Sequence, residues 1–98
     1  MKEITTTELQ QQLENGATLH MIDVREDEEV EQGMIPGAIH IPLGEVPDRL
    51  SELDKATPYV IICRSGGRSG RAAEFLEAQG YDATNMVGGM LDWQGNVE

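Results

Sequence analysis

The only cysteine of the chain, Cys63, follows directly after the apolar run 59–62. The residues that come next combine two arginines, two glycines and two serines: Arg64, Ser65, Gly66, Gly67, Arg68 and Ser69. A helical pattern starts at about Ser69, and the unpaired N–H groups at a helix start attract an anion. Together with the charge of the two arginines, such surroundings lower the pKa of a thiol from roughly 8.5 to about 3.5–7.5. The segment therefore predicts a reactive thiolate.

The composition of this loop also indicates what the thiolate could do. Gly66 and Gly67 let the backbone adopt positive φ and turn its amides toward a ligand, which forms a nest for an anion. Cys63, or a persulfide formed on it, would lie at the focus of that nest. Arg64 and Arg68 could hold an anionic donor such as thiosulfate by charge-assisted hydrogen bonds, with the two serine hydroxyls as further donors. The loop contains no histidine or carboxylate to act as a general base, which suits a nucleophile that is already ionised.

Strands and helices alternate along the chain, and no tight hairpin signal links the strands. This order predicts a parallel sheet covered by helices on both faces, an α/β fold. Ligands of such sheets bind outside the carboxyl ends of the strands, so Asp23 and Cys63, which both follow strands, are expected on one rim. The predicted strands are 18–23, 38–41, 58–62 and 83–87; the predicted helices are 6–15 with Thr5 as N-cap, 26–32, 45–53 and 69–79, with a last helical turn that ends near Trp93.

Residues outside the loop are expected to support it. Asp23 is expected to accept backbone N–H bonds, and Arg25 to pair with an acid of the run 26–31, which otherwise forms a solvated surface. His40 is expected to be a packed or partly exposed strand residue, and Trp93 a lid on the core. Two histidines and one cysteine without close spacing do not make a zinc site, so no metal and no cofactor are expected.

The length and the charge of the chain limit the classes of function that it could have. The 98 residues fit one domain, 1–98, and the formal net charge of −11 opposes binding to nucleic acid or to an anionic membrane surface. No apolar stretch approaches the roughly 20 residues of a membrane span. No signal peptide is visible, and one unpaired cysteine fits a reducing compartment, so the expected location is cytoplasmic.

Four segments, taken in order, resemble the single-domain rhodanese family of sulfurtransferases over essentially the whole chain. They are Ile22-Asp23-Val24-Arg25, the stretch 33–42 (GMIPGAIHIP), the loop 63–69 (CRSGGRS) and the stretch 88–93 (GGMLDW). Two residues depart from the family pattern: Met34 stands where a histidine is usual, and Val30 where an aromatic residue is usual. Both lie away from the loop in sequence, so we expect them to affect packing or the pocket wall.

The resemblance implies a three-layer fold with a five-stranded parallel sheet and helices on both faces. It also implies a thiosulfate:cyanide type of sulfurtransferase, in which Cys63 takes sulfane sulfur from thiosulfate or a persulfide and passes it to a thiol or cyanide. An alternative is a non-catalytic persulfide carrier that docks to partner proteins of a sulfur relay. A third possibility is a cysteine-dependent phosphatase or arsenate reductase of the same fold. The loops of those enzymes are one residue longer between cysteine and arginine, and the shorter ring here favours a single sulfur atom.

Overall fold

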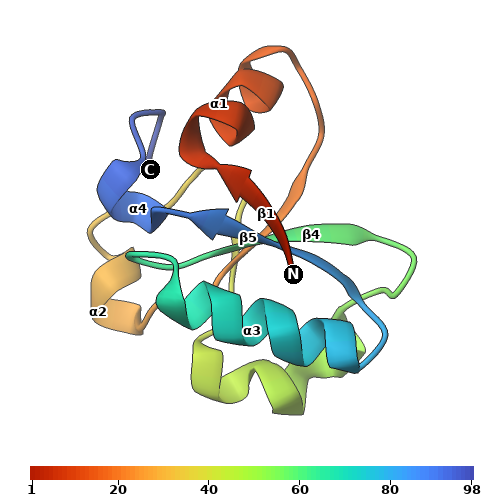
Figure 1. Ribbon diagram of the computed structural model, residues 1–98. Helices are drawn as coiled ribbons and strands as arrows, with labels where there is room; N and C mark the ends of the chain where they lie inside the picture. The colour runs from red at the N-terminus through yellow and green to blue at the C-terminus, as the bar shows by residue number, and fades with distance from the viewer.

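The computed structural model describes all residues, 1–98, as an α/β domain around one parallel sheet (Figure 1). The sheet has five strands in the order β1-β5-β4-β2-β3, and every neighbouring pair is parallel. The strands are β1 (Lys2–Thr5), β2 (His20–Asp23), β3 (Ile39–His40), β4 (Pro58–Ile62) and β5 (Asp82–Val87). The helices are α1 (Thr6–Glu14), α2 (Asp27–Val30), the 3₁₀ segment η1 (Leu43–Glu52), α3 (Gly67–Ala78) and α4 (Gly89–Asp92). The predicted three-layer architecture is confirmed.

The core is divided by the sheet into two clusters, because successive side chains of a strand point to opposite faces. Ile61 packs with α3 and η1 on one face, whereas Val60 and Ile62 pack with α1 and the segment around α4 on the other. Figure 1 shows α3 and η1 on one side of the strands and α1 on the opposite side. The central strand β4 is therefore covered on both sides, and its carboxyl end lies at the middle of one rim.

Local sequence accounts for the ends of α1. The side chain of Thr5 accepts a hydrogen bond from the Glu8 amide at 3.1 Å, and the Glu8 carboxylate accepts one from the Thr5 amide at 2.9 Å. This is the predicted capping box. At the other end, Gly16 has φ +86°, a left-handed conformation that ends the helix at little cost.

Two elements differ from the sequence-based predictions. Strand β1 is absent from those predictions, because Lys2, Glu3 and Thr5 are polar and exposed and give no apolar alternation; it pairs along β5, with Lys2 opposite Thr84. The predicted helix 45–53 is a 3₁₀ segment, and Arg49 within it has a non-helical φ of −119°. Pro47 lies inside this segment, where it lacks an N–H group for a regular helical ladder.

No helix of the domain combines the length and the apolar character needed to cross a membrane.

Candidate active site

The loop after β4 turns into α3 within a few residues. Gly66 has φ +103° and is the N-cap of α3, which starts at Gly67, two residues before the predicted start. A Cβ on Gly66 would lie 3.3 Å from the Gly88 amide nitrogen. The left-handed turn at Gly66 thus depends on glycine, and it brings the backbone of the loop back over the end of β4.

The start of α4 is bound to the same loop. The amide of Met90 donates to the carbonyl of Cys63 at 2.9 Å, and the amide of Leu91 donates to the carbonyl of Arg64 at 3.0 Å. A Cβ on Gly89 would lie 2.3 Å from that Arg64 oxygen, so only glycine allows this close approach. The glycine pair 88–89 therefore allows the start of α4 to hydrogen-bond to the loop and hold it in place.

Hydrogen-bond donors converge on the sulfur of Cys63. The amide of Gly66 lies 3.0 Å from Sγ, and the hydroxyl of Ser69 lies 3.2 Å from it. Cys63 is 0% exposed and joins the core cluster on the α3 face. The sulfur therefore lies at the base of the loop, surrounded by groups that can stabilise negative charge.

The pKa of Cys63 lies below its ordinary value. Burial acts to raise the pKa, and it is the largest single influence. Hydrogen bonds from the Ser69 side chain and from the amides of Ser69, Gly66 and Ser65 lower it, and together they outweigh burial. The leading contributions to thiolate stability thus come from loop N–H and O–H groups, whereas the sequence suggests a large share for the arginines.

Asn85, on β5, supports this arrangement and was missed by sequence reasoning. Its side-chain nitrogen donates to the carbonyl of Gly66 at 3.1 Å, and its oxygen lies within hydrogen-bond reach of the Ser69 hydroxyl. The side chain is 4% exposed and every polar atom is paired. Since Ser69 has one hydroxyl proton, Asn85 and the sulfur compete for it. An amide side chain inside the predicted strand 83–87 was the available signal.

Arg68 is held by a carboxylate from α2. Its two terminal nitrogens contact the two oxygens of Glu29 at 2.6 and 2.8 Å, in a bidentate pair. The hydrogen bond from Arg68 is the main cause that lowers the pKa of Glu29 to about 2, and it likewise raises the pKa of Arg68. Figure 1 shows α2 beside the loop that leads into α3. The expectation of a purely solvated acidic run is therefore wrong for Glu29, whereas Arg64 is exposed and makes no ion pair.

Asp23 and Arg25 form a buried pair on the neighbouring strand end. Asp23 is 0% exposed and accepts the backbone amide of Arg25 at 3.0 Å, as predicted for its backbone bonding. The prediction that Arg25 pairs with an acid of the run 26–31 is wrong, because its guanidinium donates to Asp23 at 2.9 Å. A fully buried carboxylate requires a charged partner, and Arg25 is the cation within reach.

The remaining donors of Arg25 fasten the segment that carries α2. They reach the carbonyl of Glu29 at 3.3 Å and that of Gly33 at 2.7 Å. His40 is half-buried, as expected for a strand residue, and its Nε2 lies 2.6 Å from the Arg25 carbonyl oxygen. Asp23 and Arg25 therefore position α2, and through it Glu29, without contacting the sulfur.

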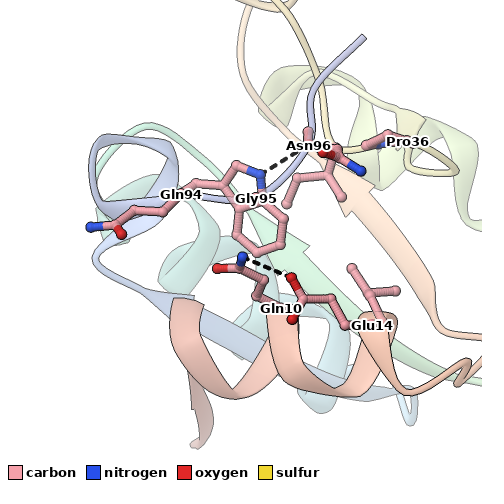
Figure 2. Close-up of a pocket in the computed structure, with 9 residues that line it drawn as sticks. Gln10, Glu14, Pro36, Gln94, Gly95 and Asn96 are labelled. Carbon is pink, nitrogen blue, oxygen red and sulfur yellow. Dashed lines mark hydrogen bonds between the residues drawn. The ribbon is translucent and has the colours of Figure 1, made fainter.

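A separate hollow of about 270 Å³ lies between α1 and the C-terminal segment. Figure 2 shows Gln10 and Glu14 on α1 facing the stretch Gln94–Asn96 and Pro36. Two hydrogen bonds lie at this hollow: Gln10 donates to Glu14 at 3.0 Å, and the indole of Trp93 donates to the Asn96 carbonyl at 3.0 Å. Trp93 is half-buried against the core cluster of the α1 face, in keeping with a lid. Neither a thiol nor a cationic side chain lines the hollow.

Comparison with known proteins places this arrangement in a family. The chain is 47% identical over 98 residues to "Putative sulfurtransferase YtwF" of Bacillus subtilis (strain 168), covering 100% of this chain and 95% of the relative. It is 44% identical over 97 residues to "Putative sulfur carrier protein YrkF" of the same organism, covering 98% of this chain but 52% of that longer protein.

Solved structures agree with the sequence relatives. The crystal structure of a rhodanese-like domain protein from Staphylococcus aureus matches with a TM-score of 0.95 and 43% identity, over 100% of this chain and 97% of the other. A family model described as the Rhodanese-like domain matches residues 5–96. From these matches, together with the cysteine loop at the carboxyl end of β4, the chain belongs to the rhodanese-like domain family.

Proposed function

We propose that this protein is a sulfurtransferase that carries sulfane sulfur on Cys63 as a persulfide. The observation that carries the proposal is the convergence of the Gly66 amide and the Ser69 hydroxyl on Sγ, with a thiol pKa below its ordinary value. A thiolate is the form that attacks sulfur, and here it needs no separate base. The relatives named as a sulfurtransferase and a sulfur carrier support the same chemistry.

The proposed reaction has two balanced steps. In the first, the Cys63 thiolate attacks the outer sulfur of a donor, the donor's bond to that sulfur breaks, and sulfite leaves from thiosulfate or a thiolate leaves from a persulfide. In the second, a thiol acceptor in its thiolate form, or cyanide, attacks the outer sulfur and Cys63 leaves as the thiolate. The same loop donors that stabilise the thiolate would stabilise the Cys63 persulfide anion. Arg64, which is exposed and makes no ion pair, is proposed as the cation that meets the donor at the mouth, with Arg68 beside it in its pair with Glu29.

The length of the loop favours the transfer of one sulfur atom over phosphate or arsenate chemistry. Four residues separate Cys63 from Arg68, and the amide of Gly66 already lies 3.0 Å from Sγ. A tetrahedral phosphate or arsenate needs a wider ring of donors than one additional sulfur atom does. A phosphatase or arsenate reductase is therefore not the function proposed.

The test is to load the protein with sulfur and weigh it intact. After incubation with thiosulfate or with a low-molecular-weight persulfide, the wild type should gain one sulfur atom, and added cyanide should remove it and yield thiocyanate. Cys63→Ser should gain none, because the chain has no other cysteine. A wild type that gains no sulfur from either donor would contradict the proposal.

A sulfur carrier is the second candidate, and the similarity to a protein named as a sulfur carrier favours it. A carrier would accept sulfur from a partner protein and show slow turnover with small donors. Transfer from a cysteine desulfurase that is much faster than turnover with thiosulfate would identify this role. Equal or faster turnover with thiosulfate and cyanide would identify the free-standing enzyme.

A further inference from the structure

The ion pair between Arg68 and Glu29 bears on which sulfur donor the enzyme takes, an inference that rests on the proposed function. Arg68 stands at the start of α3, next to the loop that holds the sulfur, and both terminal nitrogens of its guanidinium are occupied by Glu29. The two side chains are 30% and 26% exposed, so the pair lies at the border of the site and solvent. The charge of the loop arginine is thus neutralised before a donor arrives.

The carboxylate is held in place by its own helix. The Glu26 amide donates to Glu29 Oε1 at 3.0 Å, which closes a capping box at the start of α2. Arg25, itself buried with Asp23, donates to the Glu29 carbonyl at 3.3 Å. An anionic donor that approached Arg68 would meet, beside the cation, a carboxylate that backbone and side-chain contacts already fix in position. Arg64, the other loop arginine, is exposed and has no acidic partner.

The charge of the reacting groups differs between the two donor classes. Attack of the Cys63 thiolate on thiosulfate brings three negative charges together, and sulfite carries two of them away. Attack on a protonated persulfide, R–S–SH, involves one negative charge; the S–S bond breaks, R–S⁻ leaves, and Cys63 holds S–SH. A site whose loop arginine is neutralised stabilises the second step better than the first.

We infer that Glu29 is a specificity-determining residue that neutralises Arg68 and thereby favours a persulfide carried on a thiol over thiosulfate as the sulfur donor. Glu29 acts through Arg68 and does not contact the sulfur. Glu26, the N-cap of α2, adds to the negative field at Arg68.

The experiment compares loading rates of Glu29→Gln with two donors by intact mass over time: thiosulfate, a dianion, and the persulfide of 2-mercaptoethanol, which carries at most one negative charge and reacts in its protonated form. Glutamine keeps an oxygen for the Glu26 amide but releases the charge of Arg68. The ratio of the thiosulfate rate to the persulfide rate should rise about tenfold, as expected when one negative charge near a dianion is removed. Using the ratio cancels any difference in the fraction of folded protein.

Two further variants separate the effect of Glu29 on Arg68 from the effect of a change in net charge. Glu28→Gln makes the same charge change on α2, at an exposed side chain with no hydrogen bond, and should alter the ratio by no more than about twofold, as a screened surface charge does. Adding Arg68→Gln to Glu29→Gln should abolish the gain, because the released cation is then absent.

The outcomes distinguish this inference from the proposed function. A wild type that loads from either donor, with Glu29→Gln no different from Glu28→Gln, overturns the role of Glu29 and leaves the sulfurtransferase intact. A ratio that stays raised in the double variant also overturns it. A wild type that loads from neither donor overturns the proposed function itself.

Discussion

The loop around Cys63 and the hollow between α1 and the C-terminal segment differ in how their polar groups are arranged. Around Cys63, N–H and O–H groups from the loop, α3 and β5 either point at one sulfur atom or hold the groups that do. In the hollow of about 270 Å³, Gln10 pairs with Glu14 and the Trp93 indole pairs with the Asn96 carbonyl, and neither a thiol nor a cationic side chain lines it. The loop therefore has the features of a reaction site although its sulfur is buried, and the hollow lacks them although it is open (Figure 2).

This contrast shows that empty volume is a weaker guide to chemistry than the convergence of buried donors. Buried donors lose their contact with water and must be paired, so donors directed at a single sulfur are stabilised most when that sulfur is charged. Donors that pair among themselves gain nothing from a guest. Substitutions at Ser69, Asn85 and Trp93 test whether the two regions differ in this way.

The largest effect is expected at Ser69. Ser69→Ala removes the side-chain donor that contributes most to lowering the pKa of Cys63, so the pKa should rise and the thiolate fraction at neutral pH should fall. A hydrogen bond to a charged group is worth about 1.5–3 kcal/mol, so sulfur loading near pH 7 should slow by roughly ten- to hundredfold. Ultraviolet absorbance of the single thiolate, followed against pH, measures the shift directly. An unchanged titration curve would show that Ser69 does not serve the sulfur.

The same lowered pKa links folding to pH. Because the folded thiol has a lower pKa than the unfolded one, the thiolate stabilises the fold above the unfolded pKa, and this stabilisation is lost as the pH falls through the folded pKa. The difference in unfolding free energy between wild type and Cys63→Ala should therefore grow as the pH rises toward the value of an unfolded thiol. Urea unfolding at a series of pH values gives this difference.

A smaller effect is expected at Asn85, behind the loop. Asn85→Ala removes two buried hydrogen bonds, one to the Gly66 carbonyl and one with the Ser69 hydroxyl, which should lower the free energy of unfolding by about 1–2 kcal/mol. Thr84→Ala, on the adjacent half-buried residue of β5, is the matched control. If the two variants unfold at the same urea concentration, the Asn85 bonds do not hold the loop.

The smallest effect on chemistry is expected in the hollow. Trp93→Phe removes the hydrogen bond to the Asn96 carbonyl and should cost about 1 kcal/mol of stability. Sulfur loading should stay within about twofold of the wild type, because the lost hydrogen bond is remote from the reacting atoms. Loading that fell as far as in Ser69→Ala would show that the hollow belongs to the site, and the contrast between the two regions would be wrong.

Much of the fold could be predicted because local patterns carry it. The capping box of Thr5 and Glu8, the apolar run of β4 and the alternation of strands and helices each depend on neighbours in sequence. Strand β1 and the 3₁₀ form of η1 could not be predicted in the same way. The first is polar and becomes a strand only by pairing with β5. In the second, the missing N–H group of Pro47 disfavours a regular helical ladder but does not by itself specify the 3₁₀ form.

For the site, the order of residues was enough to predict the reactive sulfur and its glycine-rich loop, because a strand, a turn and a helix start are contiguous and need no distant partner. Which charges meet depends instead on how the folded chain buries and orients them. Arg25 is neutralised by Asp23, two residues before it, and Arg68 by Glu29, from a helix 39 residues earlier in the chain, while Asn85 arrives from β5. Several acids could satisfy each arginine on paper, and only folding, which buries some and leaves others in water, selects the pairs.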